Sequence, residues 1–88
     1  MVGMLCTSKA GHDLGEVYVI VKEEQEYIYV ADGRNKTIAT PKRKNRKHIQ
    51  IIKKEINQEL TEKLRKLETV RDEEIKRVIT LYKEDRRL

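Results

Sequence analysis

A block of basic side chains is the feature of this sequence with the clearest chemistry. Residues 34–54 contain nine lysine and arginine residues and no acidic residue, so the block carries a formal charge of +9. Like charges at this density repel one another unless water solvates them or an anion faces them. Arginine can hold a phosphate through two parallel hydrogen bonds, and lysine supplies a mobile charge. The block therefore predicts contact with a phosphate backbone, and so nucleic-acid binding.

The candidate contacts lie in and around the densest part of this block. A base edge could be read by Asn45, whose side-chain amide both donates and accepts hydrogen bonds. The candidates are Arg34, Lys36, Lys42, Arg43, Lys44, Asn45, Arg46, Lys47 and His48. Two other interpretations stay open, because a basic run is often only a solvated loop and residues 41–47 also look like a nuclear import signal. Phosphate contacts carry little sequence information, so we expect RNA to be recognised by shape rather than by base order.

Catalytic or metal-binding chemistry has little support in this sequence. Cys6 is the single cysteine, and a lone cysteine in a strand is usually a small core residue. One cysteine and two histidines fall short of the roughly four ligands of a zinc site. The pattern Gly11-x-x-x-Gly15 lacks the ending of a phosphate-binding P-loop, and Asp13 between these glycines is most simply a turn former that binds nearby backbone N–H groups. We therefore expect a protein that is not an enzyme and needs no cofactor or metal ion.

Alternating β-branched and aromatic residues predict a sheet in the first part of the chain. We expect short strands at residues 3–8, 16–23, 27–31, 36–40 and 48–52. Asp32-Gly33 is a favoured two-residue hairpin turn, and Pro41 should end the fourth strand because proline cannot donate to a ladder. Lys42 to Lys47 would then form a basic loop at one end of the sheet. Five short strands joined by turns are typical of a small antiparallel barrel or sandwich.

The strand at residues 16–23 carries apolar groups on both of its faces. We expect Val17, Val19 and Val21 to fill the barrel, with Tyr18 and Ile20 on its outside, covered by the helices that follow. Tyr27 and Tyr29 alternate with apolar neighbours. These two rings could stack on bases if exposed, or pack on the helices, and the sequence leaves both open.

A change to helical periodicity marks the last third of the chain. Apolar residues spaced three and four apart predict two helices, at about residues 57–67 and 70–86. Asn57 is a plausible N-cap for the first, and Thr69 to Asp72 resembles a capping box for the second. We expect the two to form a hairpin that docks on the barrel. The alternative is one long helix through Thr69, which would expose an apolar stripe and favour dimerisation.

The first 54 residues also resemble a known family. The residues concerned are Gly3-Met4-Leu5-Cys6, the loop Gly11-His12-Asp13-Leu14-Gly15, the strand Val17-Tyr18-Val19-Ile20 and the segment Lys47-His48-Ile49. They resemble the KOW-motif ribosomal proteins, most closely the archaeal and eukaryotic large-subunit family called fourteen-e, and short bacterial KOW-domain RNA-binding proteins. The resemblance implies an SH3-like barrel and further RNA contacts from Lys9, Gly11 and His12. Leu14 departs from the family, in which a lysine commonly precedes the glycine.

These expectations combine into one prediction of fold and function. The fold is α+β, with a small five-stranded SH3-like (KOW) β-barrel at residues 1–54 and a C-terminal helical hairpin within residues 55–88. The function is RNA binding, associated with the ribosome, with ribosomal RNA and the large subunit as partners. A cytoplasmic location is expected, because a lone cysteine suits a reducing compartment and no apolar run approaches the ~20 residues of a membrane span. The alternative is a protein-interaction module of a translation or transcription complex, and the oligomeric state stays open.

Overall fold

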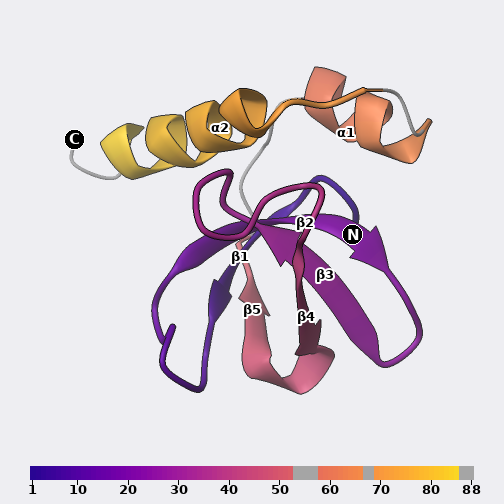
Figure 1. Ribbon diagram of the computed structural model, residues 1–88. Coiled ribbons are helices and arrows are strands. Elements are labelled where there is room, and N and C mark those ends of the chain that lie inside the picture. Colours follow the sequence, from indigo (N-terminus) through magenta and orange to yellow (C-terminus); the bar gives the residue numbers. More distant parts are fainter. Residues whose placement is uncertain (53–57, 67–68, 86–88) are drawn as a thin grey trace.

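The computed structural model describes residues 1–52, 58–66 and 69–85 of the 88-residue chain. Within them the elements are β1 (Leu5–Ser8), β2 (Val17–Glu23), β3 (Tyr27–Ala31), β4 (Lys42–Asn45), the 3₁₀ turn η1 (Arg46–His48), β5 (Ile49–Ile51), α1 (Gln58–Arg65) and α2 (Asp72–Asp85). Figure 1 shows a curled sheet with both helices on one side of it. The α+β class predicted from the sequence is confirmed.

The strands form one antiparallel sheet in the order β4-β3-β2-β1-β5. The first three strands follow one another in a meander, and β5 returns to pair with β1. Within the described residues, the edge strands β4 and β5 are joined by η1 but not by a hydrogen-bonded ladder. The sheet therefore curls without closing into a complete barrel.

The basic segment forms strand β4 rather than the projecting loop that the sequence predicts. Lys42–Asn45 pairs with β3, whereas residues 36–40, expected as a strand, lie in the loop between β3 and β4. The Asp32 carboxylate shapes this loop by accepting hydrogen bonds from the backbone N–H groups of Arg34 at 2.8 Å and Lys36 at 3.0 Å. Lysine and asparagine are weak strand formers, so β4 depends on tertiary partners for its charged side chains.

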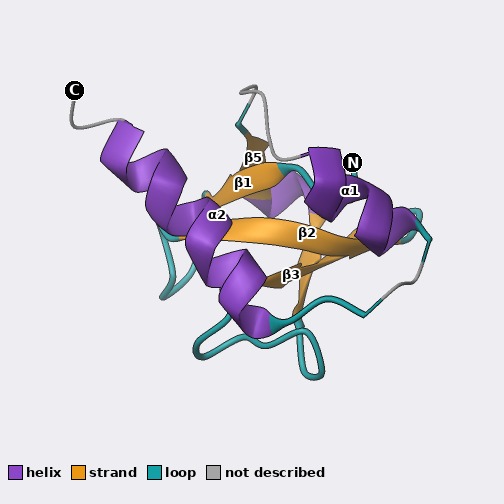
Figure 2. Cartoon of the chain, turned by 90° about the horizontal axis from the view of Figure 1, so that it is seen from above, coloured by secondary structure: helices purple, strands orange, loops and turns teal. Residues whose placement is uncertain are grey.

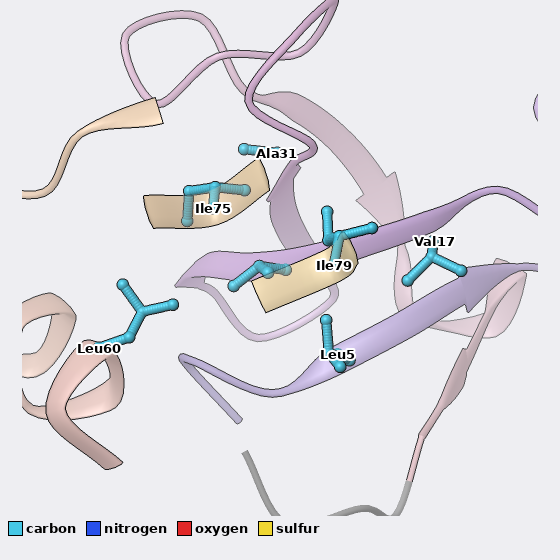
Figure 3. Packing of buried hydrophobic residues seen from close by; sticks show 7 residues of the cluster. Leu5, Val17, Ala31, Leu60, Ile75 and Ile79 are labelled. Atoms are coloured by element: carbon cyan, nitrogen blue, oxygen red, sulfur yellow. The ribbon is translucent and has the colours of Figure 1, made fainter. Parts of the chain in front are cut away.

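Both faces of the sheet are apolar, but the structure reverses the predicted assignment of the faces. The helix face packs Leu5, Val17, Val19 and Ala31 against Leu60 of α1 and Ile75 and Ile79 of α2 (Figure 3). The opposite face gathers Cys6, Tyr18, Ile20, Ile28, Val30 and Ile49. The expectation that Tyr18 packs under the helices is therefore wrong. A buried tyrosine hydroxyl needs a polar partner, and on the opposite face this hydroxyl donates to Asp13 at 2.8 Å.

The two predicted helices are confirmed, with a different arrangement and a different cap. Figures 1 and 2 show α1 and α2 following one another over the helix face, with α2 crossing β2, rather than packing side by side as a hairpin. The capping acceptor of α2 is Glu74, whose carboxylate accepts the Arg71 backbone N–H at 2.8 Å. Asp72 instead accepts the backbone N–H of Ile38 at 2.9 Å, which ties the β3–β4 loop to the helix. Asn57, the other predicted cap, lies outside the described residues.

A glycine with positive φ lies beneath each helix. Gly3 has φ of 89°, and a side chain there would collide with Thr61 of α1. Gly33 has φ of 80°, and a side chain there would collide with the Asp72 carbonyl and Lys76 of α2. Left-handed backbone and a close approach both favour glycine. No helix among the described residues is long and apolar enough to cross a membrane.

Candidate nucleic-acid interface

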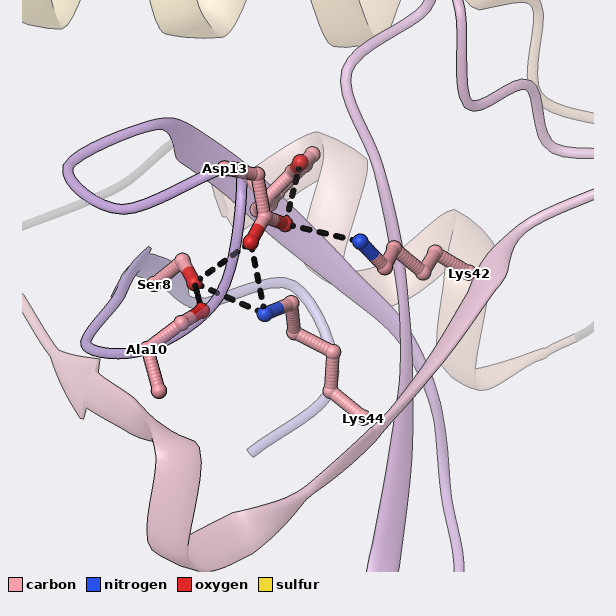
Figure 4. Close-up of polar contacts among 6 residues, drawn as sticks. Ser8, Ala10, Asp13, Lys42 and Lys44 are labelled. Carbon is pink, nitrogen blue, oxygen red and sulfur yellow. Dashed lines mark hydrogen bonds and ion pairs between the residues drawn. The ribbon is translucent and has the colours of Figure 1, made fainter.

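Asp13 is the centre of a polar cluster that links the glycine loop (residues 9–15) to the basic strand β4 (Figure 4). Its Oδ1 atom lies 3.0 Å from the Lys44 Nζ and 2.9 Å from the Ser8 Oγ. Its Oδ2 atom accepts from the Tyr18 hydroxyl at 2.8 Å and from the Lys42 Nζ at 3.1 Å. We call these five residues the Asp13 cluster. Asp13 was expected to bind backbone N–H groups, but its carboxylate is occupied by side-chain donors from three strands.

The Ser8 hydroxyl of the Asp13 cluster lies near two hydrogen-bond acceptors but can donate only one proton. Ser8 Oγ lies 2.9 Å from both the Asp13 carboxylate and the Ala10 carbonyl, and it accepts from the Lys44 Nζ at 2.7 Å. A hydroxyl donates one proton, so the two acceptors compete for it while the lysine occupies the oxygen. Ser8 is buried, and these contacts satisfy it without water.

Two members of the Asp13 cluster, Asp13 and Tyr18, have strongly shifted pKa values. Burial alone would raise the pKa of Asp13, but hydrogen bonds from the other members of the cluster hold it well below its usual range. Burial and the hydrogen bond to Asp13 raise the pKa of Tyr18 above its ordinary value. The carboxylate is therefore ionised and the phenol neutral at physiological pH. This is the state in which the carboxylate best pairs with two lysines.

The alternation of β4 divides the predicted RNA contacts between two faces. Lys42 and Lys44 project toward Asp13, and the Lys44 residue is only 8% exposed. Arg43 and Asn45 lie on the other face, because successive side chains of a strand alternate. Lys44 is thus committed to an internal ion pair, whereas Arg43 is exposed to solvent.

The next two candidates are occupied in fixing η1. Arg46 Nη2 lies 2.8 Å from a Glu23 carboxylate oxygen, and its Nε donates to the Gln25 carbonyl at 2.7 Å. The side chain therefore fastens η1 to the β2–β3 turn. The Asn45 Oδ1 accepts the backbone N–H of Lys47 at 3.0 Å and caps η1. The amide oxygen proposed to read a base edge is used inside the protein.

Arg34 and Lys36 lie elsewhere, in the β3–β4 loop beside α2. Arg34 lines a cavity of about 350 Å³ whose walls also include Glu16, Lys76 and Glu84. Both signs of charge are present there, so this cavity lacks the uniformly positive lining of a phosphate site. Two of the predicted RNA contacts, Arg34 and Lys36, therefore belong to the β3–β4 loop and not to β4.

Several exposed side chains lie where the glycine loop touches η1. The Lys9 backbone N–H donates to the His48 carbonyl at 2.7 Å, which places the two segments side by side. We call this surface the loop end; its exposed basic and histidine side chains are Lys9, His12, Lys47 and His48. All four were among the candidates from the sequence. Ser8, Tyr18 and the role of Asp13 were missed, although an aspartate enclosed by glycines ahead of a basic segment was an available signal.

Comparison with known proteins adds no further assignment. No protein-family model matches this chain, and no curated protein matches it significantly. Among the described residues, no group of three or more histidine, cysteine or carboxylate side chains is placed to hold a metal ion. The functional interpretation therefore depends on the geometry of the loop end and of β4.

Proposed function

We propose that this protein binds RNA through the loop end. The proposal is carried by the contact between Lys9 and His48, which joins the glycine loop to η1 at 2.7 Å. The Asp13 cluster helps to hold this contact in place, because the Asp13 carboxylate fixes the glycine loop to β4 through two lysines. Holding exposed cations on a rigid surface reduces the entropy that they lose on binding phosphates.

The order of the strands supports membership of the KOW class with an SH3-like fold. The first strand, the glycine loop and the second strand follow one another as in KOW proteins, and β5 returns beside β1. In the resembled ribosomal family, the glycine loop and its neighbours touch ribosomal RNA. We therefore place the activity in the cytoplasm, with ribosomal RNA of the large subunit as the preferred target.

The mechanism is phosphate neutralisation by a small number of positioned cations. Lys9 and Lys47 at the loop end, with Arg43 on the adjacent strand, are exposed. Each phosphate that they neutralise releases counterions, so affinity should fall with salt. For about two to three contacts, log K against log salt should slope by about −2 to −3.

A salt titration with matched variants tests this function. Fluorescence anisotropy would follow the binding of labelled ribosomal RNA hairpins to the full chain. The pair Lys9→Gln and Lys47→Gln should weaken binding and make the slope shallower by about 2. Lys66→Gln, just after α1, with Arg77→Gln in α2 removes the same charge from exposed positions remote from the loop end, and this pair should change the affinity and the slope less. A flat slope in the unmodified protein, or equal effects of the two pairs, would contradict the proposal.

The alternative, a protein-docking module, receives less support. Such a module would need an exposed apolar surface on the helical tail, but Ile75 and Ile79 are buried against the sheet. Val78 and Tyr82 pack at the margin of the same core. The stripe that would dock a partner or a second copy is used within the fold.

A further inference from the structure

Strands β2, β3 and β4 carry two tyrosine rings flanked by cations on the face of the sheet that the helices also cover. Tyr29 pairs with Lys22 on one side and with Arg43 on the other, and Tyr27 pairs with Asn45. Directly paired residues share a face, so these side chains lie on one surface. We call Lys22, Tyr27, Tyr29 and Arg43 the tyrosine platform.

The rings of the platform belong to neither buried core. Tyr27 and Tyr29 are partly exposed, and neither is a member of the cluster under the helices or of the cluster on the opposite face. The Arg43 guanidinium carbon lies 4.6 Å from the centre of the Tyr27 ring. The Lys22 ammonium lies 5.2 Å from the centre of the Tyr29 ring. Both distances are within the range of cation–π attraction.

The distribution of aromatic residues makes this surface unusual within the chain. The sequence has four tyrosines and no phenylalanine or tryptophan. Tyr18 is buried in the Asp13 cluster, and Tyr82 packs at the margin of the helix-face core. The other two rings, half of the aromatic content, lie together on the platform. Both rings are partly buried, outside the two apolar cores and beside the cations Lys22 and Arg43.

We propose that the tyrosine platform stacks unpaired RNA bases, which extends the proposed RNA-binding function and rests on it. Aromatic rings and guanidinium planes are the groups on which proteins stack splayed-out bases. Arg43 presents the exposed side of its guanidinium group over Tyr27, and Lys22 supplies a charge beside Tyr29. A base stacked at Tyr27 or at Tyr29 would therefore have a cation, Arg43 or Lys22, close to the phosphate of the same nucleotide. This complementarity selects a single-stranded nucleic acid over an acidic peptide, which offers charge without bases.

The platform is continuous with the loop end. Asn45, opposite Tyr27, immediately precedes η1, and Lys47 lies within η1. Figure 1 shows η1 at the side of the sheet remote from the helices. An RNA strand could therefore stack at Tyr27 and Arg43 and continue along η1 to the phosphate contacts of Lys47.

Acidic residues of the β2–β3 turn border the platform at Tyr29. The β2–β3 turn contains Glu24, whose carboxylate accepts a hydrogen bond from the Tyr29 hydroxyl and raises the pKa of the phenol, with Arg43 acting in the opposite sense. Glu23 is paired with Arg46. Because carboxylates repel phosphates, the RNA backbone should avoid the Glu24 side of the platform and follow β4, and the ion pair with Arg46 neutralises Glu23 beside η1. Tyr27 and Arg43 are then the main stacking pair, and Tyr29 is the second.

The first test compares single-stranded and duplex RNA in the full chain. The probes are a 12-nucleotide oligoadenylate and a blunt duplex of the same length. The double variant Tyr27→Leu and Tyr29→Leu should lose about tenfold or more in affinity for the single strand, at an unchanged salt slope. Tyr27→Phe with Tyr29→Phe keeps the rings and should stay within about twofold of the unmodified protein. Unchanged affinity of the leucine variant would overturn the proposal.

A second variant keeps the test decisive if the leucine substitutions unfold the sheet. Arg43→Lys preserves the charge of an exposed residue but removes the planar guanidinium. It should weaken single-strand binding several-fold with the same salt slope, whereas a purely electrostatic role predicts equal binding. Equal affinity of the unmodified protein for single strand and duplex would also overturn the platform, with the loop-end function intact. A flat dependence of affinity on salt would instead contradict the proposed RNA-binding function itself.

Discussion

The carboxylate of Asp13 and the ammonium group of Lys44 lie 3.0 Å apart, although 31 residues separate them in the chain. Their side chains are 13% and 7% exposed, so the pair is largely removed from water. The contact connects the glycine loop to β4 and allows a strand of lysine, arginine and asparagine to exist. The same pairing withdraws Lys44 from the RNA surface and leaves Arg43 exposed.

Replacing Asp13 by asparagine should destabilise the protein strongly. The substitution leaves Lys44 buried with its positive charge uncompensated. Removing one partner of a buried pair typically costs about 3 to 5 kcal/mol. Urea unfolding followed by circular dichroism should therefore show a free energy of unfolding lower by about 3 kcal/mol.

The matched control removes the charge of Lys44 as well. A double variant with Asp13→Asn and Lys44→Met has no buried cation to compensate, and methionine fills a similar volume. Its stability should recover much of the loss of the single variant. If Asp13→Asn alone is as stable as the unmodified protein, the pair has little energetic importance and the cluster does not hold β4.

The same carboxylate should make stability depend on pH in the acid range. Hydrogen bonds in the cluster hold the pKa of Asp13 below its ordinary value despite its burial. Its stabilising contribution is then fully present above its unfolded pKa of about 4 and is lost as the pH falls toward the lower folded pKa. Between about pH 5 and pH 2.5, the free energy of unfolding should decrease more for the unmodified protein than for Asp13→Asn.

Other carboxylates with lowered pKa values contribute in the same direction, and the comparison removes them. Glu23 is stabilised as an anion by Arg46, and Glu74 by the Arg71 backbone and Lys63. Both titrate in the unmodified protein and in the Asp13 variant alike. Parallel pH profiles of the two proteins would show that Asp13 is not responsible for acid sensitivity.

Local patterns were sufficient for most of the fold. Val17 to Glu23 and Tyr27 to Ala31 have strong β-propensity and alternate, so β2 and β3 are visible in the sequence. The helical spacing likewise predicts α1 and α2. β4 could not be predicted, because Lys42–Asn45 has weak propensity and the partner that stabilises it, Asp13, is distant in sequence.

The candidate site was predictable in composition but not in arrangement. The charge count correctly marks residues 42–48 as basic, and the resemblance draws attention to the glycine loop. Which cations face outward depends on the strand alternation of β4 and on the ion pair of Arg46 with Glu23. Both follow from long-range contacts that a linear pattern does not contain.

Alanine at Gly33 should loosen the attachment of α2 to the sheet. Gly33 has φ of 80°, and a Cβ atom there would collide with the Asp72 carbonyl and with Lys76. Gly15 provides a matched control, since its φ is 85° but a Cβ atom would have nothing within 4 Å. Gly15→Ala should cost about 1 kcal/mol from backbone strain alone, whereas Gly33→Ala should cost clearly more.

Urea unfolding of both alanine variants measures the difference. The loss specific to Gly33 should come with weaker protection of α2 amides in hydrogen exchange, because the helix is the element displaced. Equal destabilisation at the two glycines would mean that α2 adjusts freely and that the close approach does not constrain it.

The thiol of Cys6 should be a probe of global opening. The side chain is fully buried in the core on the opposite face, and burial raises its pKa to about 12, with nearby Lys44 acting in the opposite sense. A thiol reagent such as DTNB, at about pH 8, should label the folded protein only as fast as the structure opens, because the thiolate is the nucleophile. In urea the same thiol should react at the rate of a free cysteine.

Asp13→Asn should accelerate labelling of Cys6 in the folded protein about a hundredfold, if the substitution costs about 3 kcal/mol and labelling requires global opening. Rapid labelling of the unmodified protein would contradict this prediction and would mean that a local motion of β1 exposes Cys6. Equal labelling rates in the two proteins would mean that this motion does not depend on the Asp13 cluster.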